Sequence, residues 1–344
     1  MRNVVRKNRL KREELKITIL ARIEGDFVAM LDEWHSLPEV WDNELDAQIH
    51  RWYSDPPVVY PQRPYFSPSS LGSCPRELYE KTRGAKRDIT GQEPYQGRWT
   101  RIGTAVGEMI QRDLLFIEKH FERMTGNRPP FVFERNPDGT PMFEEFAKMN
   151  KKVTFLGETF YLYGAPDGIM RYITDDGEAI RVGLEIKTKQ TTAARTSLYT
   201  MRGPEEEHVR QVLGYGYMFD CDYYIILYVN TAKKSWGMSD EEYEKTPDIR
   251  AFCIPITADR VAEILEKPAD IVRRVRENDP PPLDLDAWAF NSYKTACATS
   301  LSDDELEEIK RKVSAISKSN LPDWKKNQYI NVYHEIITIR EGRP

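Results

Sequence analysis

Hydrophobic and polar residues alternate along the chain between Ile180 and Lys187. Because the side chains of a strand point to opposite faces in turn, this pattern predicts a strand with one buried face. The apolar set is Ile180, Val182, Leu184 and Ile186, and the opposite set is Arg181, Gly183, Glu185 and Lys187. Glu185 and Lys187 are therefore expected to lie side by side on the face away from the apolar set.

A tight turn connects this strand to the segment before it. Asp175-Asp176-Gly177 suits a three-residue hairpin loop with its glycine in the left-handed conformation. Such a loop pairs Thr174 with Glu178, and the same register places Asp167 opposite Glu185. One loop geometry thus brings an aspartate, a glutamate and a lysine together.

The same patterns predict the other elements. Apolar residues recur at helical spacing in residues 1–60, 99–123, 204–219, 258–277, 302–317 and 322–340. A shorter helix follows Cys74, with Ser73 as its N-cap, and residues 125–150 are expected to form a loop. Strands are expected at 152–163, 166–173, 179–189, 223–230 and 250–256. This order predicts an α/β fold in which helices flank a central mixed sheet.

Composition narrows the class of protein. The chain has 344 residues, 31% of them charged, and a net charge of −5, which argues against a generic basic nucleic-acid binder. DNA stays possible as a ligand, because a bound metal ion would bring its own positive charge. No apolar run reaches the length of a membrane span, and the basic N-terminus lacks the apolar stretch of a signal peptide, so we expect a cytoplasmic protein without membrane contact.

The carboxylates of Asp167 and Glu185 are candidate metal ligands. Two carboxylates in contact repel each other unless a cation lies between them. Oxygen ligands of this kind suit Mg²⁺ or Mn²⁺. The alternative is a solvated strand face that carries an ordinary Glu-Lys pair, and this stretch alone leaves both interpretations open.

The motifs around this pair resemble those of a known superfamily. Pro166-Asp167 followed by Glu185-Ile186-Lys187 resembles the signature of the PD-(D/E)XK nucleases. Gln211 and Tyr215, which share a helix face at this spacing, are similar to the Gln-x-x-x-Tyr element of the RecB-like branch.

The helix over 99–123 departs from the RecB-like pattern. Gly103 matches its glycine, but Gly107 stands where the relatives carry a histidine ligand. The next residue, Glu108, is then a candidate metal ligand, as a carboxylate on this helix is in some phage exonucleases. The alternative is an ordinary solvated glutamate.

A further segment, from Ser69 through Cys74-Pro75-Arg76, resembles the motif with the first cysteine ligand in CRISPR-associated RecB-type nucleases and related phage-encoded exonucleases. In those proteins the cysteine is the first of four ligands of an iron–sulfur cluster. The other ligand positions fall here on Trp288, Asn291 and Cys297. Because two thiolates do not hold such a cluster, we expect a degenerate site without iron, with Cys74 and Cys297 close together.

The resemblance implies the function and a role for each residue. It implies a nuclease domain over 65–300, between helical extensions at 1–60 and 301–344. The implied activity is a Mg²⁺- or Mn²⁺-dependent deoxyribonuclease with one or two ions, an exonuclease of DNA recombination, repair or phage replication. Its partners would be DNA and a recombination or replication protein. The catalytic residues would be Asp167, Glu185 and Lys187, the metal ligands Glu108, Asp167, Glu185 and the Ile186 carbonyl, and the substrate-binding residues Gln211, Tyr215, Lys189 and Arg76.

Two alternatives stay open at this point. One is an inactive protein of the same fold that binds DNA ends or serves as a scaffold. The other is an endonuclease of the restriction or repair type.

Overall fold

A computed structural model describes residues 2–89 and 91–342 of the chain, with side chains from Thr18 onward. Its contacts divide the chain into two compact units. The sheet unit comprises Met1–Tyr60, Gln92–Lys151 and Tyr163–Val261, and the helical unit comprises Pro61–Gly91, Lys152–Leu162 and Ala262–Pro344. This division differs from the three segments expected from the sequence, because the N-terminal helices share a core with the sheet.

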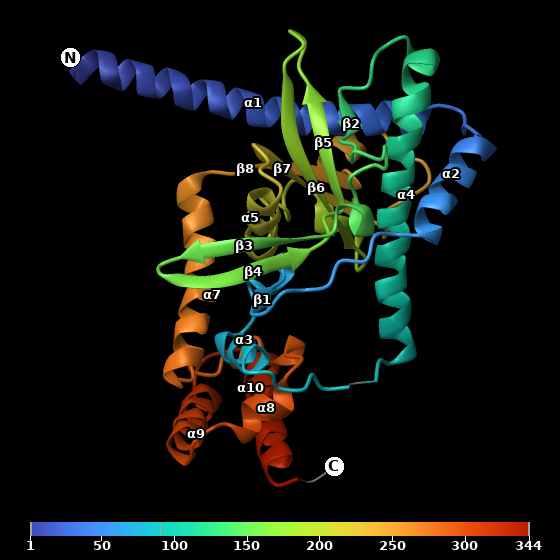
Figure 1. The fold of residues 1–344 in the computed structure, drawn as a ribbon. Coiled ribbons are helices and arrows are strands. Elements are labelled where there is room, and N and C mark those ends of the chain that lie inside the picture. The colour runs from blue at the N-terminus through green and yellow to red at the C-terminus, as the bar shows by residue number, and fades with distance from the viewer. Residues whose placement is uncertain (1, 90, 343–344) are drawn as a thin grey trace. The chain divides into compact units, whose positions relative to one another are not determined.

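The sheet unit is built on a mixed five-stranded sheet in the order β2-β5-β6-β7-β8 (Figure 1). The strands are β2 (Phe131–Phe133), β5 (Gly168–Ile173), β6 (Ala179–Lys189), β7 (Tyr223–Asn230) and β8 (Ile249–Pro255). β6 and β7 are parallel, and the other neighbours are antiparallel. The expected mixed α/β fold with helices flanking the sheet is confirmed.

Helices of the sheet unit cover both faces of this sheet. Its helices are α1 (Arg2–Ser36), α2 (Asn43–Ser54), α4 (Pro94–Thr125), α5 (Glu206–Met218) and α6 (Asp240–Lys245), with short 3-10 turns at Glu144–Ala147 and Ala193–Thr196. Phe27 of α1 and Leu114 of α4 lie in one core with Val182 and Leu184 of β6. α5 packs on the opposite face, where Gln211 reaches Glu185. The face expected to be apolar is thus buried, and the opposite face meets α5.

Local chemistry explains where α4 begins and ends. Pro94 occupies the first turn, and Glu93 and Gln96 form a reciprocal capping box. Gly126 ends the helix with a φ of 81°, a left-handed conformation that glycine adopts without steric penalty. The helix begins earlier than expected from its apolar stripe, because that stripe does not extend into the capped first turns.

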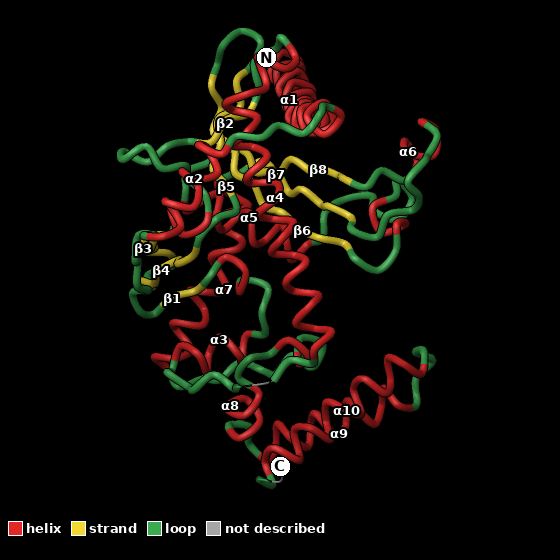
Figure 2. Tube along the Cα trace, turned by 90° about the vertical axis from the view of Figure 1, so that its right-hand side faces the viewer, coloured by secondary structure: helices red, strands yellow, loops and turns green. Residues whose placement is uncertain are grey.

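The helical unit contains α3 (Pro75–Thr82), most of α7 (Ala258–Glu277), α8 (Lys294–Thr299), α9 (Asp303–Ser317) and α10 (Asp323–Arg340), with 3-10 turns at Pro68–Ser70 and Trp288–Phe290. Figure 2 shows α9 and α10 side by side, and Ile309, Val313, Val332 and Ile336 pack in their common core. A small sheet has the order β1-β4-β3, made of β1 (Tyr65–Phe66), β4 (Glu158–Gly164) and β3 (Met149–Phe155).

Several expected elements are corrected. The strand expected at 152–163 is the hairpin β3–β4, which turns at Leu156 and Gly157 with φ values of 49° and 82°. The expected loop at 125–150 contains β2, an edge strand of the main sheet. The residue that caps α3 is Cys74 rather than Ser73, and its side chain forms no capping hydrogen bond.

The hairpin at Asp175-Asp176-Gly177 has the predicted geometry. Gly177 has a φ of 82°, and the backbone N–H of Thr174 donates to the carbonyl of Glu178 at 2.9 Å. The ladder runs from Ile173 opposite Ala179 to Gly168 opposite Leu184. This register fixes where Asp167 meets β6.

Among the described residues, no helix combines the length and the apolar character that a membrane crossing requires.

Candidate active site

Asp167 lies at the point where β5 begins, next to Glu185 of β6. The last pair of the ladder is Gly168 with Leu184, so Asp167 comes one position beyond it. There its Oδ2 accepts a hydrogen bond from the backbone N–H of Ile186 at 2.6 Å. The preceding residue, Pro166, accepts a backbone hydrogen bond from Glu144 at 2.7 Å. The backbone of β6 thus binds the carboxylate of Asp167, and Glu144 fixes the main chain just before it.

Glu185 is buried and uses only one of its carboxylate oxygens. Its side chain is 5% exposed, and Oε1 lies 2.8 Å from Nζ of Lys187. The same oxygen accepts a hydrogen bond from Nε2 of Gln211 at 2.8 Å. Oε2 is buried and has no hydrogen-bond partner among the described residues. A buried carboxylate oxygen without a partner is costly unless a ligand fills that place.

Lys187 and Gln211 complete a closed set of contacts around Glu185. Nζ of Lys187 donates to Oε1 of Gln211 at 3.0 Å, while the other end of the same amide bonds Glu185. The amide of Gln211 therefore links the carboxylate of Glu185 to the amine of Lys187. Each of the three side chains contacts the other two. The structure brings Gln211 to the inner side of the site, where it orients these groups.

The carboxylates at this site resist ionisation. Burial raises the pKa of Asp167, and the charge of Glu185 raises it further. Burial also raises the pKa of Glu185, while Lys187 and Gln211 act in the opposite direction. A cation placed between the two carboxylates would offset both effects. The electrostatics therefore suit a site that is completed by a positive ion.

Two tyrosines close the side of the site that faces α5. Tyr215 is 6% exposed, and its ring stacks against Tyr224 with centroids 6.5 Å apart. Burial and then the charge of Glu185 raise the pKa of both phenols. The Oη atom of Tyr224 is buried without a hydrogen-bond partner among the described residues. Tyr215 thus lies in the wall of the site rather than on an open surface.

Sequence reasoning missed Tyr224 and the reason for Gly183. These residues are paired on neighbouring strands, and the ring of Tyr224 lies directly over the glycine. A Cβ atom at Gly183 would lie 2.0 Å from the ring. Glycine at this position makes room for the aromatic wall. The alternation in β6 contained the signal, since Gly183 is the one residue of its face without a side chain.

α4 lies close to both strands that carry the motif. A Cβ atom at Gly103 would lie 3.5 Å from Oγ1 of Thr188, in ordinary contact. Farther along, Nε2 of Gln111 donates to the backbone carbonyl of Asp167 at 2.9 Å. Between them, a Cβ atom at Gly107 would meet nothing within 4 Å. Position 107 thus opens onto free space.

Glu108 has a different environment from the one expected. It is exposed, it lines a cavity with Tyr53 and Gln111, and its charge acts on Tyr53 and Glu144. The groups that shift the pKa of Asp167 and Glu185 do not include it. Its role as a metal ligand stays a prediction.

Glu144 is a carboxylate of this site that sequence reasoning missed. Burial raises its pKa, and the charges of Asp167 and Glu108 raise it further. Its φ of 45° is unusual for a residue with a side chain, and such strain is often kept at functional sites. Because it lies in a segment that reads as a loop, no periodicity could indicate it. With Asp167 and Glu185, Glu144 is the third carboxylate of this site.

The remaining expected substrate contacts, Lys189 and Arg76, are occupied by protein groups. Nζ of Lys189 lies 2.5 Å from a carboxylate oxygen of Glu205. The guanidinium of Arg76, in the helical unit, is fully buried, donates to Glu305 at 2.8 Å and also bonds Ser300. A buried and saturated guanidinium has no donor left for DNA, so the expectation that Arg76 contacts substrate is corrected to a structural role.

The expected iron–sulfur positions lie together in the helical unit. Cys74, Trp288 and Cys297 are buried in one core cluster, and both thiols are free. Nδ2 of Asn291, also buried, donates to Sγ of Cys297 at 3.4 Å. The two intermediate positions of the expected motif thus carry an indole and an amide beside the two thiols. The absence of a cluster stays a prediction.

The donor set at Asp167 and Glu185 fits a hard divalent cation. It offers carboxylate oxygens, one of them buried and unpartnered, on adjacent strands. A second group of potential ligands among the described residues is Glu205, Glu207 and His208 at the start of α5. There, however, Glu205 already binds Lys189, and the hydroxyl of Tyr228 lies 2.8 Å from Nδ1 of His208. The first group is the better candidate.

Comparisons with known proteins give likenesses of low similarity. No protein-family model matches the chain. No curated protein matches it in sequence. The crystal structure of SSO0001 is 14% identical with a TM-score of 0.39 and covers 75% of this chain and 95% of its own.

Two structures described as exonucleases also match. An alkaline exonuclease from Laribacter hongkongensis is 11% identical with a TM-score of 0.36, over 62% of this chain and 89% of its own. A phage-related exonuclease from Haemophilus somnus is 14% identical with a TM-score of 0.32, over 64% of this chain and 96% of its own. Likeness at this level carries no argument about activity, which has to come from the site.

Proposed function

We propose that this chain is a metal-dependent deoxyribonuclease that hydrolyses phosphodiester bonds as an exonuclease. The observation that carries the proposal is the pairing of Asp167 with Glu185 around a buried, unpartnered carboxylate oxygen. Lys187 lies 2.8 Å from the same glutamate. Two acids and a lysine in this order and geometry fit the motif Pro166-Asp167…Glu185-Ile186-Lys187.

Each residue has a defined task in this proposal. Asp167, Glu185 and the carbonyl of Ile186 would hold Mg²⁺ or Mn²⁺, with Glu144 and Glu108 as further carboxylates close by. A bound divalent cation supplies an acidified water and neutralises charge on the phosphate. Lys187 holds the attacking water and offsets negative charge. Gln211 holds the side chains of Lys187 and Glu185 in position. Tyr215 and Tyr224 exclude bulk water from one side of the site.

The substrate in this proposal is DNA, and the setting is recombination, repair or phage replication. The motifs support this choice rather than the charge of the whole chain, which is −5. A protein with this balance contacts the phosphate backbone through local groups of cations instead of a broad basic surface.

Incubation with linear and closed circular DNA, each with Mg²⁺ or Mn²⁺, tests the proposal. We expect progressive loss of linear DNA and intact circles. Nicking of the circles would replace the exonuclease with an endonuclease. Absence of cleavage with both metals would leave a protein that only binds DNA, and the proposal would be wrong.

A matched pair of variants ties the activity to the site. Asp167→Asn is expected to lower cleavage by about 10³-fold or more, because it removes a charged ligand but hardly any volume. Asp259→Asn makes the same chemical change at an exposed aspartate of α7 and is expected to cleave at the wild-type rate. Circular dichroism of both variants confirms that the fold is retained.

A further inference from the structure

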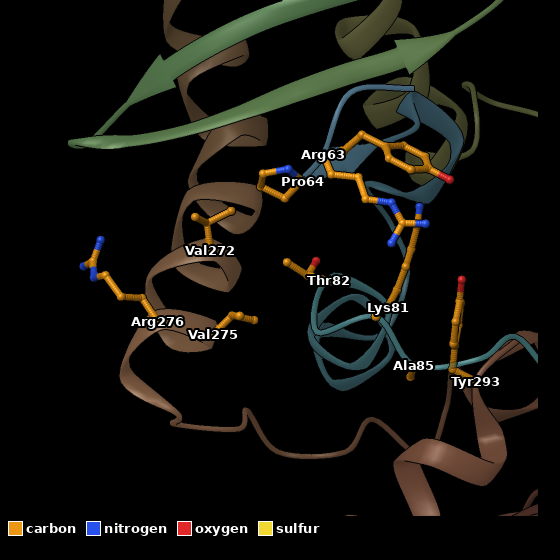
Figure 3. Close-up of a pocket in the computed structure, with 11 residues that line it drawn as sticks. Arg63, Pro64, Lys81, Thr82, Ala85, Val272, Val275, Arg276 and Tyr293 are labelled. Carbon is orange, nitrogen blue, oxygen red and sulfur yellow. The ribbon is translucent and has the colours of Figure 1, made fainter. Parts of the chain in front are cut away.

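The helical unit contains a cavity of about 460 Å³ beside α3 and the second half of α7. Residues from three other parts of this unit also line it: the turn after α3, the segment before β1, and Tyr293 before α8. Figure 3 shows that its lining is divided. The side chains of Arg63 and Lys81 and the hydroxyl of Tyr293 approach one another on one side, and Val272 and Val275 lie on the other. The cavity thus has a cationic end and an apolar end.

Three cations line this pocket, and they differ in their partners: Arg276, next to Val275, is paired with Glu158 at 2.5 Å, whereas within the described part of the chain Arg63 and Lys81 are not paired in this way. Neither Arg63 nor Lys81 forms an ion pair within 4 Å among the described residues, although Nζ of Lys81 lies 4.3 Å from the ring centre of Tyr65. Burial lowers the pKa of Lys81, and the charges of Arg87 and Arg63 lower it further, against the opposing charge of Glu77. The carboxylate of Glu77 acts on Lys81 through its charge without a direct ion pair, and its Oε1 accepts the backbone N–H of Ser292 at 3.0 Å.

A second polar feature lies in the same wall. Oγ1 of Thr82, at the end of α3, is buried and has no hydrogen-bond partner among the described residues. Threonine near a helix end commonly bonds a backbone carbonyl of the preceding turn, and this one does not. Figure 3 places Thr82 between Lys81 and Val272, on the side of α3 that faces the cavity. Thr82 is thus a residue of the pocket wall whose hydroxyl oxygen is itself covered by other atoms.

These features together describe the chemistry of the ligand. Crowded cations without carboxylate partners fit a phosphate group. A neighbouring apolar wall fits a flat base, and the volume lies within the range of ~300–1,000 Å³ that is usual for small-ligand sites. A base that enters a pocket cannot be stacked and paired in a duplex at the same time. The ligand that meets all three conditions is a nucleotide of an unpaired strand.

We propose that this pocket binds one nucleotide of single-stranded DNA, with its phosphate at Arg63 and Lys81 and its base against Val272 and Val275. The choice of DNA over another phosphorylated ligand rests on the proposed nuclease function. The pocket lies outside the unit that carries Asp167 and Glu185, so it is a separate binding site for the strand.

Binding of a fluorescent single-stranded oligonucleotide, measured without divalent cations so that no cleavage occurs, tests this inference. The variant Arg63→Gln/Lys81→Gln is expected to weaken binding by about 10-fold or more, and the salt slope to fall by ~0.7 for each lost phosphate contact. Lys310→Gln/Arg311→Gln removes the same charge from the exposed surface of α9 and is expected to bind like wild type. If both variants weaken oligonucleotide binding equally, the loss comes from total charge rather than from the pocket. That result would overturn the proposal.

A further variant and a competition experiment define the ligand. Val272→Phe fills the apolar end of the pocket without a change in charge. We expect this variant to bind the oligonucleotide more weakly at an unchanged melting temperature. Wild-type affinity in this variant would overturn the placement of the base. Deoxymononucleotides and inorganic phosphate are expected to compete only at much higher concentration than the oligonucleotide. Equal affinity of a free nucleotide, or tighter binding of RNA than of DNA, would also overturn the proposal.

A failure of the pocket proposal can be told apart from a failure of the proposed nuclease function. Cleavage of linear DNA by the wild-type protein is scored separately with Mg²⁺ or Mn²⁺. If the wild type cleaves DNA but the pocket variant binds unchanged, the pocket is wrong and the nuclease stands. If the wild type does not cleave but the pocket variant loses binding, the pocket stands and the nuclease is wrong.

Discussion

The Nζ atom of Lys187 lies 2.8 Å from Oε1 of Glu185, whereas Oε2 of the same carboxylate is buried without a hydrogen-bond partner among the described residues. The lysine thus neutralises one oxygen and leaves the other available. Gln211 holds both groups, at 3.0 Å from the amine and 2.8 Å from the acid. This arrangement allows one glutamate to bind a lysine and a cation together.

Loss of Lys187 is expected to separate metal binding from catalysis. In Lys187→Met a competing cation is gone, so Mn²⁺ should bind several-fold more tightly, as measured by calorimetry. Cleavage should nevertheless fall by ~10²–10³-fold, because the group that offsets charge on the phosphate is lost.

An exposed lysine provides the control for this change. Lys310→Met makes the same substitution on the exposed surface of α9 in the helical unit, so the affinity for Mn²⁺ should stay at the wild-type value. Weaker Mn²⁺ binding in Lys187→Met than in wild type would contradict the arrangement.

Gln211 is expected to act as a positioning residue. Gln211→Leu removes the amide that links Lys187 to Glu185, and kcat should fall by roughly 10- to 100-fold with little change in KM. Arg210→Gln, one residue earlier in α5, is the control and should leave both constants unchanged. A rise in KM at constant kcat would instead identify Gln211 as a contact to the DNA backbone.

Gly183 is expected to be intolerant of any side chain. In Gly183→Ala the new methyl group would lie 2.0 Å from the ring of Tyr224, and the strand or the ring has to move. We expect a loss of about 2–3 kcal/mol in the free energy of unfolding, measured with urea. Gly203→Ala, where a Cβ atom meets nothing within 4 Å, should cost far less. Equal stability of the two variants would contradict the packing described for Tyr224.

His208 is expected to make the fold sensitive to acid. Burial lowers its pKa to about 4, with the charge of Lys187 acting in the same direction. Because the unfolded chain binds this proton near pH 6.5 and the folded chain does not, stability is present above that pH and is lost as the pH falls toward about 4. Partial solvent screening makes the expected loss roughly 1–2 kcal/mol.

A pair of histidine variants isolates this effect. The difference in the free energy of unfolding between about pH 7 and about pH 5 should shrink in His208→Gln. The same change at the exposed residue His50 should leave that difference unaltered. A wild-type pH dependence in His208→Gln would show that other groups cause the acid sensitivity.

The sequence predicted the hairpin of the motif because that geometry depends on neighbours in the chain. The alternation in β6 and the glycine of the turn determine the register, and with it the meeting of Asp167 and Glu185. The spacing of Gln211 and Tyr215 likewise predicted a common helix face, and the structure shows that this face meets the strand.

The other members of the site could not be predicted, because they depend on contacts between distant segments. Glu144 reaches Asp167 from an irregular segment, and Tyr224 enters through the parallel pairing of β6 with β7. The resemblance assigned Arg76 to substrate binding, whereas Glu305 and Ser300 bind its guanidinium in the core of the helical unit. Periodicity contains no information on such partners.

A crystal structure grown with Mn²⁺ and measured at the manganese absorption edge tests the central claim most directly. The account predicts an anomalous peak between the carboxylates of Asp167 and Glu185, within bonding distance of the unpartnered Oε2. No peak there at saturating Mn²⁺, or a single peak at Glu205, Glu207 and His208 instead, would contradict it.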